Sequence, residues 1–296
     1  MPRDRLLAAL DREVPGALQE ADGQGCILPK SAAEVATVVR LATAIGVRLV
    51  PPGGIEREGA VPIDLRRMSA ILGMDDTSHL VHVEGGVLIP TLEVELRRRS
   101  LTLGIEGTLP EEPVGAWLAA GALGARDHDD DPVDQLVAGL EAVLPDARHL
   151  DIRPAPRRAV GPDLVGAFIG ARGRLGIVTG AHLVARRRTQ SVELAFRLPS
   201  RHAAEAARAW IRGRGVRPAA SAVVEADGEV VLRLRLEGSD GVREASIEVA
   251  RRTAAERGGI AVDPGSAPAR ARRRAVPESD VVRRLAARMD RAGALS

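Results

Sequence analysis

The chain contains very few aromatic residues and a single cysteine. Two tryptophans, two phenylalanines and no tyrosine make aromatic residues 1% of the 296 residues. Proteins that bind single-stranded nucleic acid by stacking need aromatic platforms, so this scarcity argues against a nucleic-acid partner. The lone Cys26 excludes an internal disulfide. It fits a reducing compartment and predicts a cytoplasmic protein.

Long apolar runs are also missing. No run reaches the roughly 18 residues that a membrane helix needs, and the first ten residues carry acids without an apolar core. We therefore expect neither membrane insertion nor an export signal. Hydrophobic residues make up 45% of the chain, charged residues 28%, and the net charge is +2. These values are typical of a globular protein, and the length allows two domains.

Two patterns of secondary structure follow each other along the chain. Up to about residue 190, helices and short strands are predicted, beginning with a capping box at Ser31 and Glu34 that opens a helix ending at Ile45. From Ser191 the predicted order is strand, helix, hairpin, helix and strand, which is the ferredoxin-like order. A linker over 263–277 and a final helix over 278–289 complete the prediction.

The segment 50–57 has the features of a phosphate-binding loop. It has the sequence Val-Pro-Pro-Gly-Gly-Ile-Glu-Arg, follows a predicted buried strand over 47–50 and precedes a strand-like segment over 63–65. Backbone amides in such a turn can cradle a diphosphate. Glu56 opposes this, because two like charges 4 Å apart repel by about 1 kcal/mol in water and about 4 kcal/mol at an effective dielectric near 20. Arg57 can either bind phosphate or pair with Glu56 or Glu58.

Four segments in order resemble the FAD-linked oxidases of the vanillyl-alcohol oxidase type. They are 28–35 with 50–54, 114–124, 133–146 and 161–179. The branches most similar to the chain are the alkyldihydroxyacetonephosphate synthases and the glycolate oxidase subunits. The resemblance implies an α+β fold with a two-subdomain PCMH-type FAD-binding domain over 1–190. A shortened ferredoxin-like cap over 191–277 and a C-terminal helix over 278–296, which packs on the FAD domain, would follow.

The same resemblance implies that three loops hold FAD. The residues that it assigns to the cofactor are Pro51, Pro52, Gly53, Gly54, Ile55, Glu56, Arg57, Gly115, Ala116, Gly124, Arg172, Gly173, Leu175, Gly176, Ile177 and Val178. Ile55, Glu56 and Ala116 depart from the family pattern of glycine, hydroxyl residue and glycine. Asp129, Asp130 and Asp131 stand where the family has Tyr-Gly, and with Asp127 they form an acidic run over 127–131. The third loop keeps the pattern best, with arginine at 172 and 174 in place of Glu and Thr.

Catalytic and metal-binding residues are not found in the sequence. Without tyrosine, the family's usual base is missing, and the six histidines are scattered with no metal-ligand spacing. His182 is the best-placed candidate base, although a structural role is favoured for it. Two functions stay open. One is an FAD-linked oxidoreductase or the accessory FAD subunit of a 2-hydroxy-acid dehydrogenase or oxidase, with a protein partner or a second copy. The other is a non-catalytic binding or scaffold subunit that has lost FAD.

Overall fold

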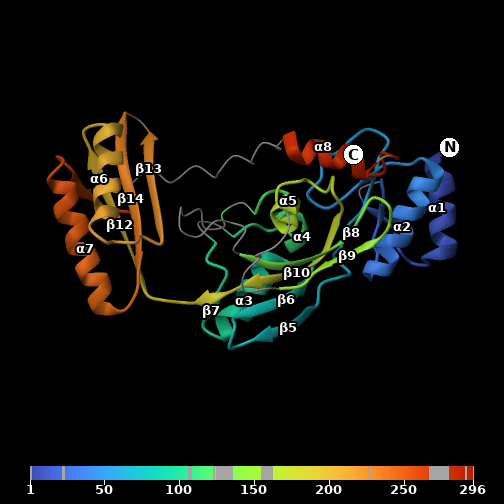
Figure 1. The fold of residues 1–296 in the computed structure, drawn as a ribbon, viewed down its shortest axis with the longest axis horizontal. Coiled ribbons are helices and arrows are strands. Elements are labelled where there is room, and N and C mark those ends of the chain that lie inside the picture. Colours follow the sequence, from blue (N-terminus) through green and yellow to red (C-terminus); the bar gives the residue numbers. More distant parts are fainter. Residues whose placement is uncertain are drawn as a thin grey trace. The chain divides into compact units, whose positions relative to one another are not determined.

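The structure is a computed structural model of the chain, and its contacts divide the chain into two units (Figure 1). It describes residues 2–21, 24–105, 109–122, 124, 136–154, 163–226, 228–266, 280–290 and 292–295. Among these, residues 187–266 form the second unit and all the others belong to the first. The first unit has two hydrophobic cores and the second unit has one.

The first subdomain of unit 1 packs two helices against short strand pairs. Its elements are α1 (Pro2–Glu13), β1 (Leu18–Ala21), β2 (Gln24–Ile27), α2 (Ala32–Ile45), β3 (Leu49–Val50) and β4 (Val61–Pro62). Helix α2 begins as predicted, because the Ser31 hydroxyl accepts a hydrogen bond from the Glu34 amide at 3.2 Å. The strand expected at 63–65 is wrong by two residues: β3 pairs in parallel with Val61–Pro62, whereas Ile63 forms an isolated bridge with Ile27 of β2.

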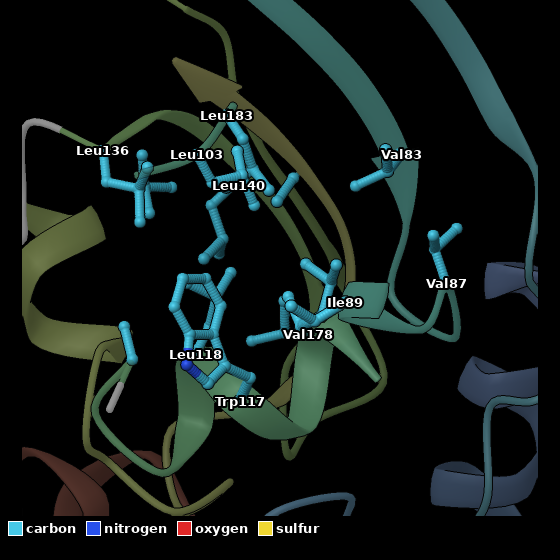
Figure 2. Close-up of a cluster of buried hydrophobic side chains, with 14 of the residues drawn as sticks. Val83, Val87, Ile89, Leu103, Trp117, Leu118, Leu136, Leu140, Val178 and Leu183 are labelled. Atoms are coloured by element: carbon cyan, nitrogen blue, oxygen red, sulfur yellow. The ribbon is translucent and has the colours of Figure 1, made fainter. Parts of the chain in front are cut away.

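The second subdomain of unit 1 is built on a five-stranded antiparallel sheet in the order β5-β6-β10-β8-β9. Its strands are β5 (Ile71–Asp75), β6 (Leu80–Glu84), β8 (Val137–Val143), β9 (His149–Ile152) and β10 (Ile177–Val184). Its helices are α3 (Ile89–Arg98), α4 (Val114–Ala119) and α5 (Leu164–Phe168), and β7 (Leu101–Thr102) pairs with β11 (Arg186–Arg187). Helices and sheet share one core around the fully buried Trp117 (Figure 2).

The end of the chain returns to unit 1. Helix α8 (Asp280–Met289) contributes Ala286 to the core of the five-stranded sheet. Leu295 lies in the core of the first subdomain, and the Leu49 amide donates to the Ala294 carbonyl at 2.8 Å. The last described residues therefore contact both subdomains.

Unit 2 is a ferredoxin-like layer of two helices on a four-stranded sheet. Its elements are β12 (Ser191–Leu198), α6 (Arg201–Gly213), β13 (Ala220–Ala226), β14 (Glu229–Glu237), α7 (Asp240–Ala255) and β15 (Ile260–Val262). The antiparallel order β13-β14-β12-β15 is the order that this motif requires. Alanines of both helices pack on Phe196 and Leu232 of the sheet. The predicted α+β class and the ferredoxin-like element order are confirmed.

Candidate cofactor site

The first and second predicted loops touch at Gly53. A Cβ atom on Gly53 would lie 2.4 Å from the carbonyl oxygen of Ala116, far inside normal contact distance. The φ angle of Gly53 is +72°, a region that residues with a side chain rarely adopt. Both the contact and the backbone therefore require glycine here, and they fix the loop against α4.

The third loop completes the contact. A Cβ atom on Gly173 would lie 2.2 Å from Cγ of Pro51, and one on Gly115 would lie 2.7 Å from the Val178 carbonyl oxygen. The Gly115 amide donates to the Gly85 carbonyl at 2.7 Å. Each of the three loops thus touches the other two, although the contacting residues are more than sixty positions apart in the sequence. The structure brings together the loops that the resemblance names.

Backbone donors are available in the first loop. Its turn is closed by one hydrogen bond, from the Gly54 amide to the Pro51 carbonyl at 2.8 Å. The amides of Gly53, Ile55 and Glu56 donate no hydrogen bond to any residue that the structure describes. Free amides on a glycine turn suit an anionic group such as a diphosphate. The backbone of this loop therefore fits the cofactor that the resemblance implies.

The side chains of the same loop carry charges of both signs. Glu56 and Arg57 are exposed and line a cavity of about 370 Å³, together with Arg3 of α1 and Glu58. Within the described part of the chain, Arg57 forms no ion pair with either glutamate. Its guanidinium is free to bind an anion, whereas Glu56 would repel one. The cavity borders the predicted cofactor residues only at Glu56 and Arg57, so it lies beside the three-loop contact rather than at it.

The third loop offers backbone groups and two arginines. The side chains of Leu175 and Val178 lie in the core of the sheet subdomain, and that of Ile177 lies in the other core. They position the loop from inside, which leaves its backbone to face a ligand. Arg172 has φ +51° and is tied to α4, because its amide donates to the Ala119 carbonyl at 2.8 Å.

Two further sequence predictions fall outside this contact. Gly124 is described only by its own turn conformation, with φ +83°, and no contact with the three loops is described for it. The acidic run at 127–131 lies outside the described residues. Neither adds to the site.

One cluster was not anticipated from the sequence. His82 and His182 stack with ring centroids 4.0 Å apart, and His82 Nε2 lies 2.7 Å from Glu141 Oε1. Burial lowers the pKa of His182, neighbouring His82 lowers it further, and Glu141 and Asp151 oppose this shift. His82 and His182 are far apart in the sequence but adjacent in the structure, so the interpretation of the histidines as scattered is wrong for these two. Only the pairing of β6 with β10 brings them together.

Comparisons with known proteins match the part of the chain that holds the first two loops. A profile of a family described as "FAD binding domain" matches residues 24–153. Alkyldihydroxyacetonephosphate synthase of Dictyostelium discoideum is 28% identical over 179 residues, which cover 56% of this chain and 29% of that protein. The mitochondrial D-2-hydroxyglutarate dehydrogenase of Arabidopsis thaliana is 30% identical over 183 residues, covering 57% and 32%.

A solved structure of alkyldihydroxyacetonephosphate synthase shares the fold, with a TM-score of 0.70 and 19% identity. The alignment covers 86% of this chain and 60% of the solved chain. Residues 24–153 therefore match an FAD binding domain, and the chain shares the fold of the solved synthase. It matches about a third or less of the length of the curated relatives named above. Within the described residues, no helix is long and apolar enough to cross a bilayer.

Proposed function

We propose that the chain binds FAD with its three loops and acts as the FAD-carrying subunit of an oxidoreductase for 2-hydroxy acids or related substrates. The observation that carries this proposal is the mutual contact of the loops through Gly53, Gly115 and Gly173. Such close approaches at glycine hold the three loops in one arrangement. The family profile and the names of the relatives supply the cofactor and the substrate class.

The residues have separate roles in this proposal. Free amides of the first loop would hold the diphosphate, and Arg57 would add a charge-assisted hydrogen bond. FAD, when bound, supplies the electron-accepting chemistry. The third loop would hold the nucleotide side with its backbone, since its apolar side chains at 175, 177 and 178 lie in the two cores.

A partner protein is part of the proposal because the chain has no tyrosine. Among the described residues of the three-loop contact, the one carboxylate, Glu56, lies in the loop assigned to the diphosphate, and the other charged side chains are the arginines at 57, 172 and 174. A general base must lie within hydrogen-bond reach of the substrate proton. We therefore assign the substrate base to a partner or to a second copy.

An FAD titration of the purified chain tests cofactor binding. The expected result is a saturable shift of the flavin absorption band. Arg57→Gln should weaken binding about fivefold, the effect of roughly 1 kcal/mol for an exposed charge. Arg48→Gln is the matched control, since it removes the same charge from an exposed position outside the three loops. Equal effects of the two changes would contradict the role of Arg57.

Turnover measurements test the role of a partner. The flavin-loaded chain alone should not reduce a dye acceptor with D-2-hydroxyglutarate, glycolate or lactate. Steady turnover by the chain alone would refute the accessory role while leaving the cofactor proposal intact.

The second candidate is a binding or scaffold subunit that holds no FAD. The position of Glu56 in the wall of the cavity favours it. In that case the unmodified chain binds no flavin, and Ile55→Gly with Glu56→Thr, which restores the family pattern, gains affinity. Ile55→Gly with Glu58→Thr is the control, because it removes the same charge from the same cavity. If neither the unmodified nor the restored chain binds FAD, the loops are not a flavin site.

A further inference from the structure

We propose that His82, Glu141 and His182 form a binding site for a divalent transition-metal ion, with Zn²⁺ as the ion that best matches the ligands. Their ligand atoms all lie within 4.8 Å of one another. Two imidazoles and one carboxylate are a ligand set that zinc accepts, with a water molecule in the fourth position. This site is independent of the cofactor proposal.

The three side chains come from the three central strands of the five-stranded sheet. His182 of β10 is directly opposite His82 of β6, and on the other side β10 pairs with β8, which carries Glu141. The neighbours of each ligand along its strand, such as Val81, Ala181 and Leu140, belong to the core. Because side chains alternate along a strand, all three ligands lie on the face away from that core.

A β-bulge places His182 on this face. The register of β10 against β8 shifts between Val178 and Gly180, which leaves Thr179 as the extra residue. Without the bulge, Val178 and His182 would lie on the same side of the sheet, because four residues separate them. With it, Val178 faces the core and His182 faces the two other ligands. Bulges often re-aim a side chain at a functional position.

Two glycines leave room for the ligands. A Cβ atom on Gly139 would lie 3.1 Å from Cδ2 of the His182 ring, and one on Gly180 would lie 2.8 Å from Oε2 of Glu141. Gly139 is paired with His182, and Gly180 with Glu141. His182 and Glu141 therefore each lie over a glycine of the neighbouring strand, an arrangement that a simple polar sheet surface does not need.

The geometry is close to what zinc requires. Zn–N and Zn–O distances near 2.0–2.1 Å place tetrahedral ligand atoms about 3.3 Å apart. The hydrogen bond of 2.7 Å between His82 and Glu141 would open slightly, and His182 would turn toward them. The side chains of His82 and Glu141 are 29% and 32% exposed, so an ion can reach them. Among the described residues, His82 is the only ion-pair partner of Glu141.

Metal titration of the full chain, with any polyhistidine tag removed, tests the site. Zn²⁺ should bind with one equivalent and compete with a chromophoric chelator, and Co²⁺ should give ligand-field absorption bands. His182→Ala and Glu141→Gln should each lower the affinity at least tenfold. His149→Ala is the matched control, because His149 is an exposed histidine of the same sheet, on β9. Zn²⁺ at 100 times its Kd should also raise the Tm by about 5 °C.

The variants separate a metal site from a structural cluster. Glu141→Gln keeps the shape of the side chain, so its circular dichroism and its metal-free Tm should stay close to those of the unmodified chain. Loss of Zn²⁺ binding in a variant that remains folded supports the proposal. No one-equivalent binding at 100 µM Zn²⁺ would overturn it. Unchanged affinity in both ligand variants, or equal loss in His149→Ala, would overturn it as well.

Discussion

Replacing Gly53 with alanine should destabilise the protein much more than the same change at Gly59, although both glycines lie in one loop with nearly the same backbone. Their φ angles are +72° and +76°. A Cβ atom at Gly59 meets nothing within 4 Å, whereas one at Gly53 meets the Ala116 carbonyl oxygen at 2.4 Å. Left-handed strain costs about 1–2 kcal/mol at either position. Overpacking adds about 1–3 kcal/mol at Gly53 alone.

The expected losses in free energy of unfolding are therefore about 1–2 kcal/mol for Gly59→Ala and about 2–5 kcal/mol for Gly53→Ala. Urea denaturation followed by circular dichroism measures both losses. Subtracting one from the other removes the left-handed strain, because both variants share it. The flavin titration then shows whether the same contact shapes the cofactor site. Equal losses at the two positions would refute the contact between the first loop and α4, and with it the three-loop cluster.

Three further experiments test packing, capping and thiol burial. Trp117→Ala should cost about 3–5 kcal/mol, because the indole is fully buried, whereas Trp210→Ala, at a position that is 53% exposed, should cost far less in the same denaturation assay. Ser200→Ala should cost about 1 kcal/mol, since its hydroxyl caps α6, while Ser239→Ala should be nearly neutral because its side chain makes no capping bond. Burial raises the pKa of the Cys26 thiol. Iodoacetamide should therefore label the native chain at least tenfold more slowly than the urea-unfolded chain at pH 8, and the native rate should rise with pH.

Local features of the fold could be predicted because neighbouring residues determine them. The Ser31 cap and the glycine that ends α2 act within one helical turn. The alternation of strands and helices after Ser191 was sufficient to predict the ferredoxin-like order. The position of β4 was predicted less well, because the pairing with β3 selects Val61–Pro62 and not the apolar residues that follow.

The two candidate sites also differ in whether the sequence predicts them. The three loops could be named from the family resemblance, since its matching segments are short and local in the sequence. His82, Glu141 and His182 could not be grouped, because strand register and the bulge at Thr179 bring them together. Alternation counted from Val178 would even have placed His182 in the core. No spacing rule along the chain contains that information.

Strand β10 connects the two proposed sites and also keeps them apart. Its first residues, Ile177 and Val178, anchor the third loop in the cores, whereas His182 lies four residues beyond Val178 and on the opposite face. At about 3.3 Å per residue, that spacing is roughly 13 Å. Charges this far apart in salt solution are largely screened. His182→Ala should therefore lower the zinc affinity at least tenfold and leave the Kd for FAD unchanged. Arg57→Gln should weaken FAD binding about fivefold and leave zinc binding unchanged. A change of more than threefold in the FAD Kd on adding Zn²⁺ would show that the bulge transmits strain between the sites, and it would refute their independence.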